Sequence, residues 1–395
     1  MWCGVLVRQI LGEIFRYTGL ILSSLLVLGI PGMVFKEQMS RHIPLANVVS
    51  LVPYLIPDCL RLALPLSLML ATIFVFGRMA GDNEITAVKS LGISPLKLIG
   101  SLLGISLVLS LFCVWLNDVA VTWTAKGICN VIQNSAEDIV YNRLSNEGEI
   151  RSDKLHIKVQ DVHGSTLVEP EIIFWSNSDK GNVTVIAKEA QLFSDIEAGE
   201  LQAELTDGTI RSELGVIAFR NKQCYRFPIT SLLRLCDNNH PAYMSLKQLR
   251  VRCAELSKLI QEKEQRLAAG SAMIFLSGDF EQINDDNWRI NHNDLEGNRR
   301  LLSKMQVEPF RRWSMGFACL CFVIVGAPVA IWSRQTNVIT CIFICAGPIL
   351  ILFAACFSIG LNLAKHSHVP PSGVCIGNVI LLVLGLFLMW NATRN

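Results

Sequence analysis

The sequence predicts an α-helical membrane protein with six transmembrane helices and a β-jelly-roll domain inserted between the third and fourth helices. Two observations lead to this prediction. Apolar segments long enough to span a bilayer lie in both terminal parts of the 395-residue chain, and the residues between them, 119–310, resemble a soluble domain. Hydrophobic residues make up 51% of the chain and charged residues only 17%. This composition excludes a disordered protein, and the net charge of +2 gives no reason to expect a nucleic-acid partner.

A spanning helix needs about 20 apolar residues, because lipid cannot satisfy exposed backbone groups. The second of the six candidate segments is unusual because it carries Asp58 and Arg61, which lie three apart and can pair on one helix face. The six segments are Tyr17–Phe35, Leu51–Phe76, Leu98–Leu116, Trp313–Ser333, Val338–Leu363 and Gly373–Trp390.

The charges of the short loops predict the orientation of the chain. With the N-terminus inside, most loop lysines and arginines fall on the cytoplasmic side, as the positive-inside rule requires. This orientation predicts two cytoplasmic termini and a central domain outside the cytoplasm. The expected cytoplasmic cations are Arg8, Arg16, Arg78, Lys89, Lys97, Arg334 and Arg394, and the expected outer ones are Lys36, Arg41, Arg311, Arg312 and Lys365.

Residues 119–240 are expected to form the β-domain, because apolar and polar residues alternate with a period of two from about Glu149 to Arg226. Leu155–Val159 is one such strand, and Glu171–Trp175 with Val183–Ile186 reads as a hairpin. Asp207 and Gly208 are a typical turn pair, so we expect a second hairpin there. Short strands at this spacing favour a sandwich or jelly roll.

Residues 241–310 are expected to form a periplasmic amphipathic helical segment, which separates the β-domain from the last three spans in residues 311–395. A second helical stretch, Leu295–Met305, is expected to fold back on the first. We interpret the first helix as lying on the β-domain, and a free coiled coil is the alternative. Its apolar stripe consists of Leu246, Leu249, Cys253, Leu256, Ile260 and Leu267.

Sequence motifs for catalysis or metal binding are missing. The chain has no P-loop, no HExxH and no GxSxG, so we expect neither an enzyme nor a cofactor. The His366-Ser-His368 run reads as a solvated loop, since no carboxylate or cysteine accompanies it. None of the thirteen cysteines forms a CxxC; Cys224 and Cys236 could pair if the domain is extracytoplasmic, which spacing alone does not establish.

The segment between the second and third spans, Phe76-Gly-Arg-Met-Ala-Gly-Asp-Asn-Glu-Ile-Thr-Ala-Val-Lys-Ser-Leu-Gly-Ile-Ser-Pro95, is too polar to cross the membrane. Asp82 or Asn83 can cap a short helix, Glu84 lies in its first turn, and Gly92 ends it. An apolar face of Ile85, Val88 and Leu91 would leave a polar face for a cytoplasmic partner. The alternative is a structural elbow between two spans.

This segment, with Ala63-Leu-Pro-Leu-Ser-Leu68 before it, resembles the lipopolysaccharide-export ABC transporter permease family, the paired F and G subunits. The 3 + β-domain + 3 layout agrees with that family. Further similar motifs are Val185-Ile-Ala-Lys-Glu-Ala190, Leu205-Thr-Asp-Gly208, Tyr243-Met-Ser-Leu-Lys-Gln-Leu249, Glu308-Pro-Phe-Arg-Arg312 and Gly326-Ala-Pro328.

The resemblance implies partners and site residues. A cytoplasmic ABC ATPase dimer would drive this chain and a second permease subunit through the coupling helix of residues 78–93, with Gly81, Asp82, Glu84 and Gly92 as its contact or shaping residues. Lipopolysaccharide would be extracted from the outer leaflet of the bacterial inner membrane and passed to a periplasmic jelly-roll bridge protein. The cations implied at its phosphates are Lys36, Arg41, Arg311 and Arg312, for which simple interfacial snorkelling is the alternative.

Three departures and two rival functions accompany this resemblance. The segment Glu262–Arg300 looks inserted, the loop Ser333–Asn337 is shorter and less basic than usual for the family, and the family's cations at the outer end of the first span have no one-to-one match, only Lys36 and Arg41 nearby. The choice between F and G subunit stays open. One rival is a permease-like mechanotransmitter that regulates an envelope enzyme without moving lipid. The other is a membrane-embedded enzyme, whose only candidate residues are Asp58 and Arg61.

Overall fold

The computed structural model describes residues 2–41, 49–90, 92, 95–134, 136–151, 155–175, 183–195, 200–212, 215–228, 241–278, 286–333, 338–366 and 369–394. The chain divides into two units by its internal contacts. One unit contains Met1–Val27, Pro57–Thr122 and His240–Asn395, and the other contains Leu28–Ile56 and Trp123–Asn239.

Six helices in the described residues are long and apolar enough to cross a membrane. Together they cover the six predicted spans, which are therefore confirmed, except that Leu51 and Gly373, the expected first residues of the second and sixth spans, lie in short 3-10 helices just before the α-helices. They are α1 (Trp2–Arg41), α3 (Val52–Gly81), α5 (Pro95–Asn134), α9 (Asp286–Ser333), α10 (Val338–Lys365) and α11 (Ile376–Arg394).

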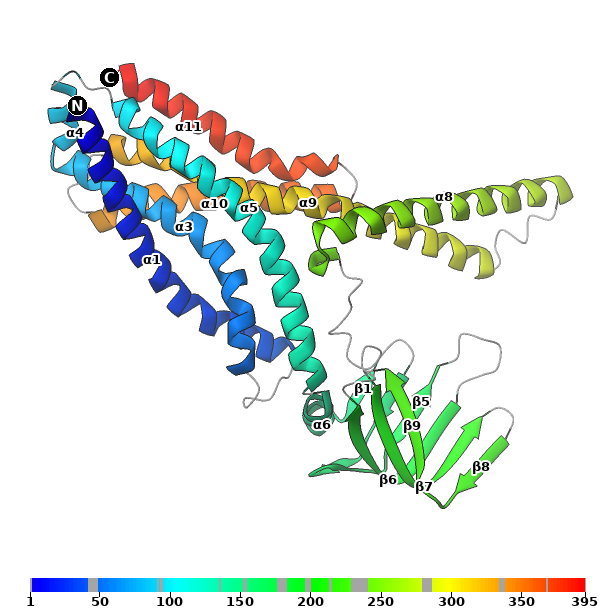
Figure 1. Cartoon of the computed structure of the whole chain (residues 1–395). Coiled ribbons are helices and arrows are strands. Elements are labelled where there is room, and N and C mark those ends of the chain that lie inside the picture. Colours follow the sequence, from blue (N-terminus) through cyan, green and yellow to red (C-terminus); the bar gives the residue numbers. More distant parts are fainter. Residues whose placement is uncertain are drawn as a thin grey trace. The chain divides into compact units, whose positions relative to one another are not determined.

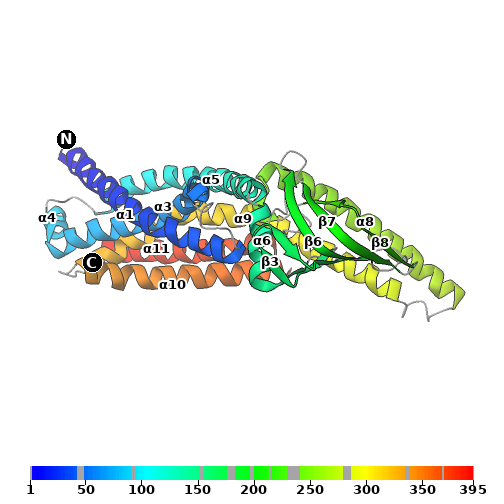
Figure 2. The same ribbon diagram turned by 90° about the horizontal axis from the view of Figure 1, so that it is seen from below.

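The first unit is a helical bundle built around α3 and α9. In the most apolar 18-residue stretch of these two helices, 67% and 72% of the residues are buried. In the corresponding stretches of α1 and α10, only 6% and 17% are buried. Gly326 of α9 faces Ile73 and Met69 of α3, at distances where a methyl group would make ordinary van der Waals contact. Both chain ends lie at one end of this bundle with the short helix α4 (Glu84–Ser90), as Figures 1 and 2 show.

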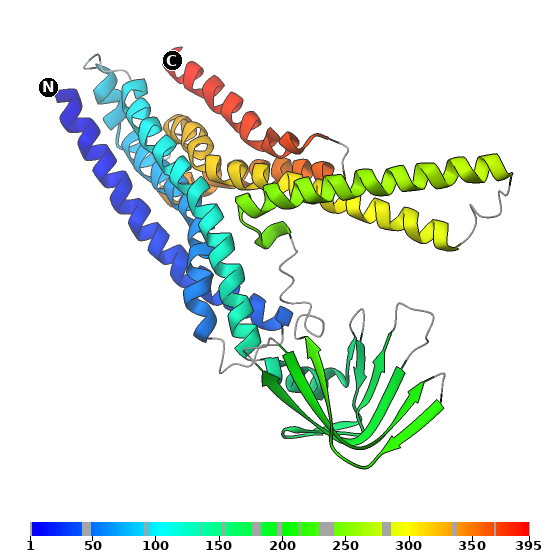
Figure 3. The same cartoon turned by 45° about the vertical axis from the view of Figure 1, so that its right-hand side comes forward.

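At its other end the bundle carries a helical hairpin. After η3 (Pro241–Tyr243), helix α8 (Leu246–Ser277) begins with a capping box between Ser245 and Gln248 and ends at Gly278 with φ 72°. It packs along the first part of α9 (Figures 1 and 3). Because α9 is one helix from residue 286 to 333, the expected boundary between residues 310 and 311 falls inside it.

The apolar stripe of α8 packs on α9, whereas we expected it to pack on the β-domain. Leu249, Cys253 and Leu256 form a small core with Leu301 and Met305 of α9. An amphipathic period predicts that one helix face is buried, and α9 buries this face where we expected the β-domain to do so. The connection from α10 to α11 includes the short 3-10 helix η5 (Pro371–Cys375).

The second unit is an antiparallel β-domain with helical elements against it. These are η1 (Val49–Leu51), α6 (Ala136–Glu147) and the ends of α1, α3 and α5. Nine strands pair in one sheet among the described residues. They are β1 (Glu149–Arg151), β2 (Leu155–Lys158), β3 (Asp161–His163), β4 (Thr166–Val168), β5 (Glu171–Phe174), β6 (Val183–Asp195), β7 (Glu200–Ser212), β8 (Gly215–Phe219) and β9 (Gln223–Pro228).

The long hairpin β6–β7 organises this sheet. Its strands pair from Asp195↔Glu200 to Thr184↔Arg211, and each has two shorter strands end to end on its outer edge. These are β5 and β4 on β6, and β8 and β9 on β7. The two halves of the long hairpin therefore belong to two groups of strands, which is the arrangement expected of a jelly roll (Figure 3). The predicted β-domain between the third and fourth spans is confirmed.

One predicted turn is wrong. Strand β7 runs straight through Asp207 and Gly208, although Asp207 has φ 52°. Gly208 pairs with Ala187, and any side chain there would meet the carbonyl oxygen of Ile186 and the ring of Phe219. The Asp-Gly pair thus accommodates an irregularity where β8 gives way to β9, and pairing with β6 keeps the strand continuous. The predicted β5–β6 hairpin is confirmed by the Phe174↔Val183 pair.

Candidate functional site

The segment that follows α3 has the local structure expected of a coupling helix. The chain leaves α3 after Gly81 and turns at Asn83, which has φ 59° and whose carbonyl accepts the Ala87 N–H at 3.0 Å. Helix α4 then runs from Glu84 to Ser90. Gly92 closes it with φ 75° and donates its N–H to the carbonyl of Lys89 at 2.9 Å. Glycine at this position avoids the strain that a side chain would suffer.

Helix α4 is amphipathic. Ile85 and Val88 are buried in the bundle core, whereas Asp82 and Glu84 are exposed. The third expected apolar residue, Leu91, lies outside the described residues. With its apolar side on the bundle and its acidic first turn exposed, α4 offers a polar surface on which a second protein can dock.

Directly before this segment, an ion pair joins the end of α3 to α1. Arg78 in the last turn of α3 donates to Glu13 of α1, with 2.6 Å between Nη2 and Oε2. The charge of Glu84 also acts on Arg78. Sequence reasoning did not find this contact, because Glu13 lies 65 positions away and inside another helix.

The four cations expected at lipid phosphates have different environments. Lys36 is exposed on α1, and Arg41 is the last residue of that helix, its side chain lying outside the described part. Arg311 is partly exposed and pairs with Glu308 at 2.9 Å. Arg312 is buried, with 1% of its side chain exposed. The structure brings Arg311 and Arg312 together on α9 and leaves Arg312 no open face toward a lipid headgroup.

Arg312 belongs to a cluster of charged side chains between α3, α5 and α9. Its Nη1 donates to Asp118 Oδ1 at 2.8 Å, and its Nη2 donates to the carbonyl of Met244 at 2.6 Å. The predicted pair of Asp58 with Arg61 is present at 2.7 Å, and the charges of Glu308 and Arg311 reach Arg61. Three carboxylates thus balance three arginines, which explains their presence without catalysis. Asp118 and Glu308 were missed, although a carboxylate beside an apolar segment is a visible signal.

Metal ligands do not gather in the described part of the chain. No group of three His, Cys, Asp or Glu side chains there could hold an ion. His368 of the expected loop pair lies outside that part, as does Cys236; Cys224 is exposed on β9.

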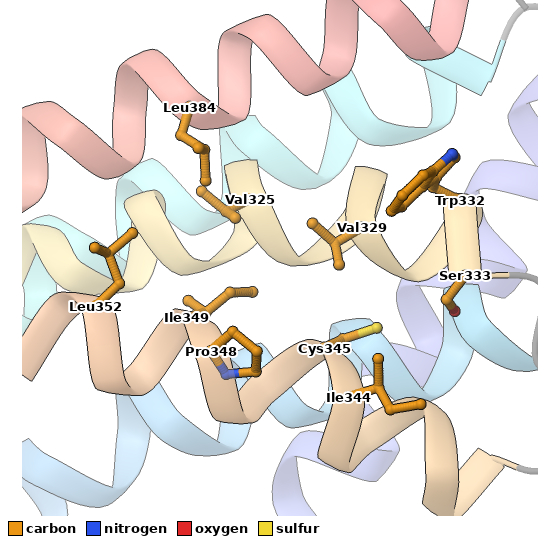
Figure 4. Close-up of a pocket in the computed structure, with 10 residues that line it drawn as sticks. All are labelled: Val325, Val329, Trp332, Ser333, Ile344, Cys345, Pro348, Ile349, Leu352 and Leu384. Atoms are coloured by element: carbon orange, nitrogen blue, oxygen red, sulfur yellow. The ribbon is translucent and has the colours of Figure 1, made fainter.

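A cavity of about 510 Å³ opens between α9, α10 and α11 (Figure 4). Its walls are mostly apolar, and Trp332 and Ser333 line it at the end of α9. Ser333 provides the one hydroxyl in the lining, and this group already donates to the carbonyl of Ala330 at 3.0 Å. The mostly apolar lining of the cavity therefore suits hydrocarbon.

Comparison with known proteins agrees with this geometry. A comparison with curated protein sequences gives no match. A model of the family described as "Lipopolysaccharide export system permease LptF/LptG" matches residues 8–391, which is nearly the whole chain. That family consists of transporter permeases and not of enzymes, and the six apolar helices are those of a multi-pass membrane protein. The chain belongs to the LptF/LptG family of lipopolysaccharide export system permeases.

Proposed function

We propose that this chain is the permease subunit of an ABC transporter that extracts lipopolysaccharide, or a related anionic glycolipid, from the outer leaflet of the inner membrane. It then passes the lipid to a periplasmic jelly-roll bridge protein. The observation that carries this proposal is the family match over residues 8–391 together with an exposed amphipathic helix between the second and third spans.

ATP hydrolysis is assigned to a separate cytoplasmic ATPase dimer that docks on α4. The exposed carboxylate of Glu84 lies in the first turn of α4, where a carboxylate is stabilised and can accept a charge-assisted hydrogen bond from arginine. Burial of Ile85 and Val88 in the bundle supports this role, because a push on α4 is then passed to the helices beneath it. Gly81 and Gly92 set the two ends of the docking segment.

A second permease subunit is assigned to the faces of α1 and α10. These two helices are the least buried of the six, at 6% and 17% of their most apolar windows. Membrane helices associate by close packing, so poorly covered faces on two spans are suited to helices of another subunit and to lipid between them. This supports a substrate cavity shared by two permeases.

Lipid phosphates are assigned to Lys36, Arg41 and Arg311. Lys36 is exposed five residues before the end of α1, and Arg41 ends that helix. Cations at the end of a spanning helix lie at headgroup depth, where phosphates attract them more strongly than in bulk water. Arg312 is left out of this set because it is buried in an ion pair.

The bridge protein is assigned to the open edge of the β-domain. Strand β8 pairs with β7 alone in the described sheet, and its Val216 and Ile217 are 65% and 67% exposed. An apolar edge strand of this kind is a template for strand addition by another β-domain.

Reconstitution of the chain with its ATPase and a second permease in lipopolysaccharide-containing proteoliposomes tests this function. We expect ATP-dependent transfer of the lipid to the bridge protein. The mechanotransmitter alternative predicts ATPase binding and hydrolysis with no lipid released, and that result would overturn the proposal. Packing of α6 residues Ile139, Val140 and Leu144 into the core of the β-domain is the observation that favours this alternative.

A further inference from the structure

Helices α5 and α9 are joined along an antiparallel seam. The backbone N–H of Leu320 donates to Ser110 Oγ at 3.0 Å, and the sulfur atoms of Cys113 and Cys319 lie 3.5 Å apart. One turn further along, Gly316 lies against Val114 so closely that a side chain at 316 would come within 2.8 Å of the Val114 backbone nitrogen. Contacts at successive turns leave little room for one helix to slide past the other.

The seam ends at Asp118, which holds three segments together. Its Oδ1 accepts from Arg312 of α9 at 2.8 Å and from the backbone N–H of Leu246 at 3.1 Å. Leu246 is the first residue of α8, where backbone N–H groups lack partners within the helix. Arg312 also binds the carbonyl of Met244, just before α8. Asp118 and Arg312 thus fasten the start of α8 to α5; we call these two residues the latch.

Beyond the latch, α8 and α9 pack against each other as a hairpin. The apolar core around Leu249 and Met305 joins them near the base, and Glu264 pairs with Arg299 at 2.7 Å further out. At 1.5 Å per residue, the 48 residues of α9 extend about 70 Å, which is more than twice the hydrocarbon thickness of a bilayer. The described residues of the segment Glu262–Arg300 belong to this hairpin, and its second helix continues into the membrane-spanning part of α9 without a break.

Helix α5 begins three residues after Gly92, the end of the coupling segment. Asp118 lies 23 residues further along, or about 35 Å in a helix, so α5 links the two ends of the bundle. We propose that Asp118 and Arg312 are positioning residues that make the α8–α9 hairpin move as one body with α5, so that a displacement of α4 is carried into the hairpin. This proposal rests on the proposed function, because that function supplies the displacement.

Leu246→Pro tests the latch with little other change. Proline is favoured at the first position of a helix and lacks the N–H that Asp118 accepts, so the variant removes one hydrogen bond and leaves α8 able to form. Ser245 already has φ −67° and ψ 157°, which suits the residue before a proline. Leu246→Ala is the matched control, since it shortens the side chain and retains the N–H. Asp118→Asn removes the charge of the latch, with Asp138→Asn, an exposed change on α6 outside the charge cluster, as its control.

The measurement uses genetically encoded spin labels on the full chain at the exposed positions Leu107 of α5 and Ser257 of α8. We expect one narrow distance distribution in the wild type, Leu246→Ala and Asp138→Asn, and loss of that narrow peak in Leu246→Pro and Asp118→Asn. Equally narrow distributions in all five proteins would overturn the latch. This arm needs no ATPase, so it is independent of the proposed function.

A second label pair, Ser257 with the exposed Val383 of α11, follows the hairpin when the ATPase complex is trapped with ADP and vanadate. We expect a shift in this distance in the wild type and Leu246→Ala, and its loss in Leu246→Pro. The same shift in all three would overturn transmission through the latch. Failure of the wild type to bind the ATPase would instead count against the proposed function.

Discussion

Arg78 at the end of α3 and Glu13 of α1 form an ion pair with 2.6 Å between nitrogen and oxygen, directly before the coupling segment. Each side chain is 31% exposed, so the pair lies at the surface of the bundle. The ion pair connects α1, the least buried of the six spans, to α3, the helix that precedes α4. Helix α1 is therefore joined to the end of α3 by this contact as well as by the packing of Ile10 and Ile14 in the bundle core.

Glu13→Gln should lower the free energy of unfolding by about 0.5–1 kcal/mol, the usual size for a partly exposed ion pair. Thermal unfolding of the purified protein in lipid nanodiscs measures this. The double variant Glu13→Arg with Arg78→Glu exchanges the two charges and restores an ion pair. It should therefore lose less stability than the single variants Glu13→Arg and Arg78→Glu lose together. If the double variant is less stable than both single variants together predict, the pair does not contribute as assigned.

Glu84→Ala should weaken ATPase docking by about 1.5–3 kcal/mol, or at least tenfold in affinity, because one charge-assisted contact is removed. The bundle should unfold at the same temperature as before, since Glu84 is exposed. Quantitative co-purification of the ATPase is the measurement, with Thr86→Ala, an exposed change on the same helix, as control. Equal ATPase recovery from both variants would remove Glu84 from the interface.

Two glycines in spanning helices give a matched pair of substitutions. Gly316→Ala should destabilise the bundle by about 1–3 kcal/mol, because the new methyl group would lie 2.9 Å from Val114 Cα. Gly347→Ala meets no atom within 4 Å and should change stability by less than about 0.5 kcal/mol. Thermal unfolding of both variants checks this, and equal stability would show that α5 and α9 are not packed as closely as described.

Tyr141 should make the stability of the β-domain fall at alkaline pH. Burial raises the pKa of this phenol above its ordinary value of about 10, and the nearby carboxylate of Glu137 raises it further. Its hydroxyl donates to the carbonyl of Ser165 at 2.6 Å and accepts the N–H of Leu192 at 2.9 Å, joining α6 to the sheet. A raised pKa in the folded state means that the stabilisation is complete below pH of about 10 and is lost as pH rises through the folded value.

Tyr141→Phe isolates this effect. The variant should lose about 1 kcal/mol at neutral pH through the missing hydrogen bonds. It should also lose less further stability than the wild type between neutral and alkaline pH. Denaturant unfolding followed by circular dichroism at several pH values measures both quantities, and parallel pH curves for the two proteins would contradict the assignment.

The features predicted from the sequence are those that local patterns determine. Hydropathy locates the spans because the bilayer imposes a minimum length, and the positions of Asn83, Glu84 and Gly92 define α4 because capping is local. Alternation locates the strand at Leu155 for the same reason. These predictions need no knowledge of what packs against what.

The features that sequence reasoning missed depend on contacts between distant residues. Arg312 was expected at a lipid headgroup and is instead buried against Asp118, 194 positions earlier. The stripe around Leu249 indicates a buried face without indicating that α9 covers it. The Asp207-Gly208 pair has the composition of a turn, and only its pairing with β6 keeps the strand continuous. In each case a partner that sequence spacing cannot reveal determines the outcome.

The most direct test of the account is a photocrosslinking amino acid at Lys36, which is exposed near the end of α1. In energised membranes that contain the ATPase and the second permease, we predict ATP-dependent capture of lipopolysaccharide at this position. Charge reversal at Arg41 should reduce the capture, and reversal at the exposed Lys258 of α8 should not. Absence of lipid at position 36, with the ATPase bound and hydrolysing ATP, would contradict the export function and favour a mechanotransmitter.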